Sequence, residues 1–182
     1  MSYIPLVLLV AVLAWFVAAY NKLVRFRNQI RNAWHQIDVQ LKRRYDLIPN
    51  LVEVVKDYMS YEQETLTKVI EARGAAVAAK GTAAQAKAEN VLTESLKSLF
   101  AVVENYPELK ANRNVAALQE ELTGTENKIS FARQFYNDSV MVYNNAIQAI
   151  PSNLIASLFN FTQETYFQAE EQDRAVPKAD LR

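Results

Sequence analysis

The stretch DVQLKRRYDLIPNLV, residues 38–52, crowds five charges and a proline into a pattern of apolar residues. Asp38 and Asp46 are of the residue type that acid–base catalysis uses, and the basic run at residues 42–44 is of the type that holds phosphate groups. The two carboxylates are eight residues apart, which is about 12 Å along a helix. That separation is too large for a carboxylate pair on one helix to act on a single bond.

The other residues supply no catalytic set either. The only histidine, His35, follows Trp34 and lies off the apolar pattern, so we expect it to be solvated. The chain has no cysteine, no glycine-rich phosphate loop and no metal-binding histidine motif. We therefore predict that the protein is not an enzyme and takes no cofactor and no metal. A hydrolase that depends on Asp38, Glu126 or His35 is the least favoured alternative.

Residues 22–44 carry seven basic side chains and a single acid, Asp38. A basic helix can contact nucleic-acid phosphates, but the 20 basic and 20 acidic residues of the whole chain cancel. A membrane flank explains the first of these basic residues more simply, because anionic lipid headgroups attract them. The run at residues 42–44 lies about 30 Å further along a helix, beyond the screening length. We predict no nucleic-acid partner.

Residues 4–20, IPLVLLVAVLAWFVAAY, contain no charged side chain. As a helix they are about 25 Å long, close to the roughly 30 Å hydrocarbon core of a bilayer. We predict a retained transmembrane anchor over residues 1–21, because a signal peptide needs basic residues that the N-terminus lacks. Basic residues follow the anchor between positions 22 and 31. The positive-inside rule then predicts a cytoplasmic C-terminal part, with a periplasmic location left open.

Helix-forming residues dominate the rest of the chain, which has three glycines and five prolines. Apolar residues recur by threes and fours from Ile30 to Val69, with a spacing between that of a straight helix and a coiled-coil seam. This ladder predicts a first helix from the membrane to about Lys80. Thr82 and Gln85 fit a capping box that opens a second helix.

A second break follows at Tyr106-Pro107, because the residue before a proline is pushed out of helical geometry. The chain either bends or reverses there. A third ladder begins at Val115 and ends at Ile147, and Ser152 is placed to cap a last helix of about 20 residues. No segment has the alternation of a strand.

These patterns predict an all-α protein. Its architecture is an N-terminal transmembrane helix followed by an up-and-down antiparallel helical bundle with a long first helix. We assign the anchor to residues 1–21, the bundle to residues 22–172 and an irregular tail to residues 173–182.

Polar residues border or interrupt the apolar ladders at several positions. Asp38 and Arg44 flank the ladder of the first helix. Pro49 leaves the Tyr45 carbonyl without its helical donor, which costs about 3 kcal/mol in a helix interior. Charges at such borders fix the register of packed helices when they are paired. We favour a register-setting polar layer over the alternative of solvated charges with a tolerated kink.

Motifs at residues 32–34, 37–52, 106–111, 118–122 and 125–129 together resemble the LemA family of bacterial membrane-anchored proteins. Tyr61-Glu62 departs from the His-Glu that relatives often carry. The resemblance implies an N-terminal span and a helical bundle, and it implies no activity and no catalytic residue. It also implies that a set of polar residues forms a structural or interaction network. That set is Asp38, Arg43, Arg44, Asp46, Pro49, Asn50, Glu126, Arg133, Tyr136, Asn137, Tyr143 and Asn144.

We expect a self-associating helical scaffold or adaptor of the bacterial inner membrane. Its expected partners are the lipid bilayer and further copies of the chain. The alternative is a regulatory adaptor that presents the helical domain to a membrane protease or another envelope-stress protein. The two hypotheses differ in whether the exposed surface binds a second copy or a different protein.

Overall fold

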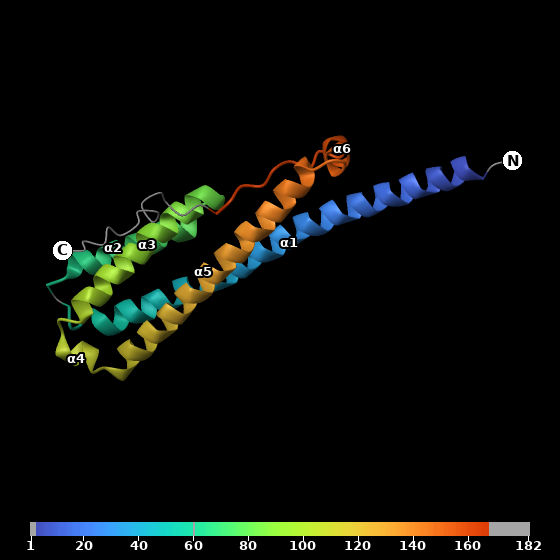
Figure 1. Cartoon of the computed structure of the whole chain (residues 1–182). Coiled ribbons are helices and arrows are strands. Elements are labelled where there is room, and N and C mark those ends of the chain that lie inside the picture. Colours follow the sequence, from blue (N-terminus) through green and yellow to red (C-terminus); the bar gives the residue numbers. More distant parts are fainter. Residues whose placement is uncertain (1–2, 60, 168–182) are drawn as a thin grey trace, which may run out of the picture. The chain divides into compact units, whose positions relative to one another are not determined.

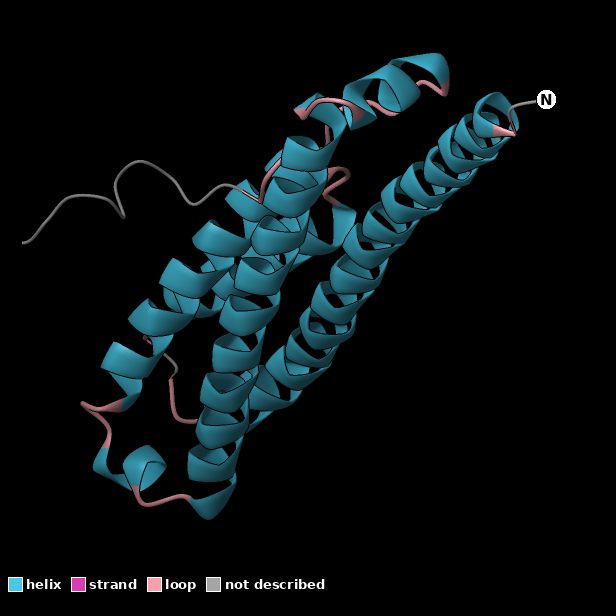
Figure 2. Cartoon of the chain, turned by 45° about the vertical axis from the view of Figure 1, so that its right-hand side comes forward, coloured by secondary structure: helices cyan, strands magenta, loops and turns pink. Residues whose placement is uncertain are grey.

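The computed structural model describes residues 3–59 and 61–167 (Figure 1). All regular secondary structure in these residues is helical (Figure 2), which confirms the all-α prediction. The predicted irregular tail at residues 173–182 lies outside the described residues, and the predicted domain boundaries stay predictions. The helices are α1 (Ile4–Val55), α2 (Gln63–Ala78), α3 (Thr82–Val103), α4 (Pro107–Lys110), α5 (Arg113–Gln148) and α6 (Ser152–Leu158).

The described residues form two compact units, and the boundaries between them fall inside α1 and α5. The first unit contains residues 3–39 and 130–166, and the second contains residues 40–129 and Phe167. Each unit therefore takes one part of α1 and one part of α5.

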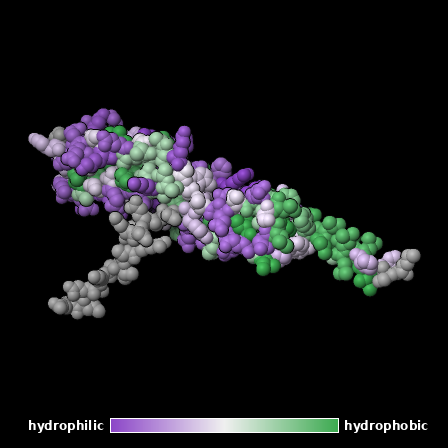
Figure 3. All heavy atoms as spheres, turned by 90° about the horizontal axis from the view of Figure 1, so that it is seen from above, coloured by the Kyte–Doolittle hydropathy of each residue, from purple (hydrophilic) through white to green (hydrophobic). Residues whose placement is uncertain are grey.

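The start of α1 is an apolar helix whose residues are exposed or half-buried. Its most apolar 18-residue window has a mean hydropathy of 2.2 and is 0% buried. Figure 3 shows the hydrophobic side chains gathered over this part of α1. Among the described residues, α1 is the helix that is long and apolar enough to cross a membrane. An exposed apolar helix of this length is costly in water and stable in a bilayer.

Further along the first unit, side chains of α1 contact side chains of α5. The Trp34 ring meets the Tyr136 ring edge-on, with 5.5 Å between centroids. The Gln29 amide donates a hydrogen bond to the Ser139 hydroxyl at 3.4 Å. Trp34 thus lies at a helix contact, and its neighbour His35 is exposed, as expected.

The first helix ends at Val55, so the prediction that it continues to about Lys80 is wrong. Residues 56–58 form a turn after α1, and Met59, which follows them, is fully buried. The apolar ladder continues through the turn because Met59 and the α2 residues Leu66 and Val69 belong to one core cluster. An uninterrupted helix would separate these side chains from Ile48 by up to about 30 Å along its axis. The turn returns them to the same core.

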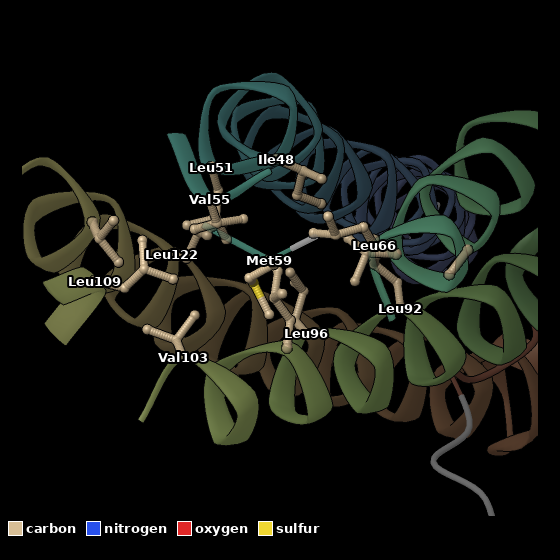
Figure 4. Packing of buried hydrophobic residues seen from close by; sticks show 14 of the residues in the cluster. Ile48, Leu51, Val55, Met59, Leu66, Leu92, Leu96, Val103, Leu109 and Leu122 are labelled. Carbon is tan, nitrogen blue, oxygen red and sulfur yellow. The ribbon is translucent and has the colours of Figure 1, made fainter. Parts of the chain in front are cut away.

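The second unit has a core built from α1, α2, α3, α4 and α5 (Figure 4). Met59 lies between labelled side chains of these helices, with Val55 and Leu96 among its neighbours. Each fully buried aliphatic side chain of this kind contributes about 1.5–3 kcal/mol. The core therefore holds α2 and α3 in place.

The expected capping box at Thr82 is absent from the start of α3. Gly81 is the N-cap, with φ of 83°, and no side chain caps the helix. Glycine adopts this left-handed φ without strain. The Gln85 amide instead donates to the Tyr45 hydroxyl at 2.8 Å and to the Ala76 carbonyl at 3.1 Å. Gln85 is thus recruited by tertiary contacts and does not serve the helix end.

The last helix is also shorter than expected. Pro151 is the N-cap of α6, and the Ser152 hydroxyl donates back to the Ala146 and Ala149 carbonyls at the end of α5. The helix ends at Leu158, and residues 161–167 have no regular structure. Pro107 separates α3 from α4, since Tyr106 has extended backbone geometry.

Candidate functional site

Arg44 on α1 is the centre of a buried charge network in the second unit. Its side chain is 2% exposed, and that of its α3 partner Glu89 is 0% exposed. The guanidinium Nη1 lies 3.1 Å from Glu89 Oε2 and 2.9 Å from Glu126 Oε2 on α5. Nη2 donates to the Thr93 hydroxyl at 2.8 Å. One arginine therefore links three helices through charge-assisted hydrogen bonds.

Tyr45 and Gln85 complete the network around the buried carboxylate. The Tyr45 hydroxyl donates a hydrogen bond to Glu89 Oε1. The Gln85 amide donates to the same Oε1 at 3.1 Å. Burial, and then the adjacent Glu89 carboxylate, raise the pKa of Tyr45 above its usual range, so its phenol stays a hydrogen-bond donor.

The network holds two carboxylates and one guanidinium. Glu89 is closed to solvent and accepts bonds from three side chains, so it cannot meet a substrate. Buried charges of this kind are tolerated only when they are paired and hydrogen-bonded. The arrangement thus acts as an internal crosslink between α1, α3 and α5. Within it Glu89 is closed to solvent, whereas Glu126 is 37% exposed.

Pro49 is accommodated by a second arginine. Proline has no N–H, so the Tyr45 carbonyl four residues earlier loses its helical donor. Arg73 Nε on α2 donates to this carbonyl at 2.8 Å. Asn50, the next residue, is exposed, and Arg73 replaces the missing donor. The helix α1 consequently continues through Pro49.

The other charged residues of the motif lie on the surface. Arg43 Nη2 is 2.5 Å from Glu121 Oε2, with both side chains 48% exposed. Lys42 and Asp46 are 3.9 Å apart and more exposed still. Exposed pairs of this type contribute about 0–1 kcal/mol. Arg44 is therefore buried within the core, whereas Lys42, Arg43 and Asp46 lie on the surface.

A second polar cluster lies in the first unit and holds residues 161–166, the C-terminal segment. Two α5 tyrosines donate to its backbone: Tyr136 to the Thr165 carbonyl and Tyr143 to the Thr162 carbonyl, each at 2.9 Å. Asn144 binds Glu164 twice, donating to its carbonyl at 2.9 Å and accepting from its N–H at 3.0 Å. Burial raises the pKa of Tyr143.

The predicted residues thus fall into separate groups. Arg44 and Glu126 lie together in the second unit. Tyr136, Tyr143 and Asn144 all bind the backbone of the C-terminal segment in the first unit. Asp38 is exposed on α1, and Arg133 and Asn137 are half-buried on α5. The network residues that sequence reasoning missed are Tyr45, Arg73, Gln85, Glu89 and Thr93.

Glu89 did carry a signal in the sequence. It lies three residues after Ala86 and three before Leu92, which are both buried. An ionised glutamate at a buried ladder position is tolerated only when it is paired and hydrogen-bonded. Within residues 3–59 and 61–167, the histidine and acidic side chains form no group of three or more that could hold a metal ion.

Comparison with known proteins identifies relatives over most of the chain. The model of the LemA family matches residues 33–181. The chain is 27% identical to Protein LemA of Metamycoplasma hominis, over 92% of this chain and 77% of that protein. It is 24% identical to Magnetosome protein MamQ 2 of Paramagnetospirillum magneticum, over 87% of this chain and 68% of that protein. It is 23% identical to Magnetosome protein MamQ of Magnetospirillum gryphiswaldense, over 92% of this chain and 71% of that protein. None of these names describes an enzymatic activity.

Proposed function

The chain belongs to the LemA family, and on this premise we propose that it is a membrane-anchored helical scaffold that associates with further copies of itself and has no catalytic activity. The family and its relatives indicate a membrane-associated helical protein. The exposed apolar start of α1 supports the anchor.

The observation that carries self-association is an exposed apolar stripe on α5, formed by Phe131, Phe135 and Val142. Their exposed fractions are 72%, 41% and 42%. At 100° per residue, the three side chains lie within about 40° around the helix axis. Asp138 shares this face and would set the register of a partner helix. Two exposed phenylalanines one turn apart are unusual on a monomer surface and typical of an interface.

We propose the absence of catalysis because of the burial and pairing of the charged groups. Glu89 and Arg44 are buried and bound to each other, and His35 is exposed on α1. Acid–base catalysis needs a titratable group that reaches its substrate. Arg44, one of the residues of this stretch that suggested phosphate chemistry, is therefore better explained as structural.

We place the protein in the bacterial inner membrane with its helical part in the cytoplasm. Lys22, Arg25, Arg27 and Arg31 follow the span, and this asymmetry supports the orientation through the positive-inside rule. The proposed helix arrangement is the up-and-down antiparallel bundle. The core shared by α1, α2, α3 and α5 in the second unit supports it.

Site-specific cross-linking tests self-association. The chain has no cysteine, so a single introduced cysteine reports on its own position. In native membranes, we expect Phe135→Cys to form a disulfide-linked dimer upon mild oxidation. Ser130→Cys is the matched control, because Ser130 is exposed on the same helix about 100° around the axis from Phe131. Equal cross-linking of both variants, or of neither, would overturn the stripe as the interface.

One observation favours the alternative of a regulatory adaptor for a membrane protease or envelope-stress partner. A cavity of about 260 Å³ opens beside the charge network and is lined by Leu96, Phe100 and Leu122, with Lys97 and Glu126 among its polar residues. It is large enough for an apolar side chain of another protein. Replacing Phe100 with glutamate would then abolish capture of one defined partner and leave the Phe135→Cys dimer unchanged. If Phe100→Glu leaves partner capture intact, the adaptor hypothesis loses its site.

A further inference from the structure

The α6 region, residues 150–159, lies beside the end of the apolar span of α1. The Phe159 ring packs against two rings of α1, with centroid distances of 6.0 Å to Phe16 and 4.7 Å to Tyr20. All three residues belong to the first unit, and Figure 1 shows α6 beside the first part of α1. Since the uncharged segment of α1 ends at Tyr20, a helix that crosses a bilayer places Phe159 in the interfacial layer.

Large apolar side chains on this region are exposed. Ile150 is 86% exposed, Leu154 is 67% exposed and Leu158 is 65% exposed. Three such side chains within nine residues would be unfavourable in water, whereas the headgroup–acyl boundary of a bilayer accepts them. The apolar surface of the span therefore continues onto the turn between α5 and α6.

A cavity of about 480 Å³ lies between the end of the span and this turn. Trp15 and Ala18 of the span and Ile150 of the turn line its apolar side, while Lys22 and Arg25 supply two positive charges. The described residues that line it include no acid. Its volume is within the range of small-molecule sites in proteins. The cavity thus combines an apolar wall at the level of the acyl chains with cations at the level of the headgroups.

We propose that this cavity binds an anionic phospholipid of the surrounding leaflet. Lys22 and Arg25 bind the phosphate, and an acyl chain lies along Trp15 and Ala18. Charge complementarity and continuity with the span identify the occupant as a lipid of the bilayer. The proposal depends on the membrane anchoring in the proposed function, and it is independent of self-association.

The test uses the full chain in vesicles that contain equal amounts of phosphatidylglycerol and phosphatidylcholine. After extraction into mild detergent, native mass spectrometry counts the lipids retained per chain. We expect wild type to retain phosphatidylglycerol over phosphatidylcholine by roughly tenfold or more, and Lys22→Gln/Arg25→Gln to lose this preference. Arg31→Gln is the matched control: it removes an exposed positive charge on the same helix away from the cavity.

A second variant separates a site from general attraction to a negative surface. Ala149 lines the cavity, and Ala149→Trp fills it without changing the charge. We expect Ala149→Trp to reduce phosphatidylglycerol retention as the double variant does, whereas an unchanged value would overturn the site. Inorganic phosphate should not displace the lipid; displacement would identify a free-phosphate site and contradict the proposal.

Flotation of the chain with vesicles tests the membrane anchor separately from the proposed lipid site. A chain that fails to float with pure phosphatidylcholine vesicles lacks the anchor, and the proposed function then fails. A chain that floats but retains both lipids equally keeps its anchor and contradicts the lipid site. Helical content measured by circular dichroism confirms that each variant is folded.

Discussion

Replacing Arg44 with methionine removes the one cation that binds both Glu89 and Glu126. Methionine preserves much of the side-chain volume, so the main effect is electrostatic. Glu89, at 0% exposed, is left without a positive partner, and Thr93 loses its guanidinium donor. Removing one partner of a buried pair costs about 3–5 kcal/mol. For a chain of this size, that corresponds to a fall in melting temperature of roughly 6 to 20 °C.

The neighbouring position provides the control. Arg43→Met removes an ion pair whose side chains are both 48% exposed, and this should cost at most about 1 kcal/mol. Thermal denaturation of the full chain in detergent, followed by circular dichroism, compares the two variants. Hydrogen exchange should show the loss of protection in α3 for Arg44→Met alone. Equal melting temperatures for the two variants would refute the assignment of Arg44 as a buried crosslink.

Three further predictions concern the polar contacts of both units. Arg73→Met should cost about 1.5–3 kcal/mol, because Arg73 donates to the carbonyl freed by Pro49. In a Pro49→Ala background, the restored N–H should reduce that cost in denaturant titrations, and an unchanged cost would contradict this role. Burial raises the pKa of Tyr45, so its phenol stays protonated in the folded chain above pH ~10, where that of the unfolded chain ionises. Stability should therefore fall as the pH rises past that value, and Tyr45→Phe should flatten the fall; parallel pH profiles would count against it. Asn144→Ala should speed hydrogen exchange in the C-terminal segment, whereas Asn145→Ala, at an exposed neighbour, should not, and equal exchange would contradict the anchoring role.

The helical class and the apolar span could be predicted because both depend on local composition and periodicity. The break after Val55 could not, since Met59 and Leu66 keep the spacing of the ladder while the chain turns. The spacing of apolar residues indicates which side chains are buried. It does not indicate whether one continuous helix or two separate helices bury them. The same limit applies to Gln85, whose capping role was overridden by tertiary contacts.

The candidate site was predictable only in part. Arg44 was recognised as a polar residue at the border of an apolar ladder and Glu126 through the family resemblance, and Arg44 Nη1 lies 2.9 Å from Glu126 Oε2. Glu89 was missed because it was not recognised as a polar residue within an apolar ladder, although Ala86 and Leu92 on either side of it are buried. Arg73 was out of reach, because its role depends on a carbonyl 28 residues earlier.

The oligomeric state of the full chain tests the central claim most directly. Mass photometry in detergent and in nanodiscs, over a range of protein concentrations, reports it without labels. The proposed scaffold predicts a discrete oligomer that dissociates when Phe131 and Phe135 are both replaced by serine. A strict monomer at every concentration, with wild type and the double variant alike, would contradict self-association.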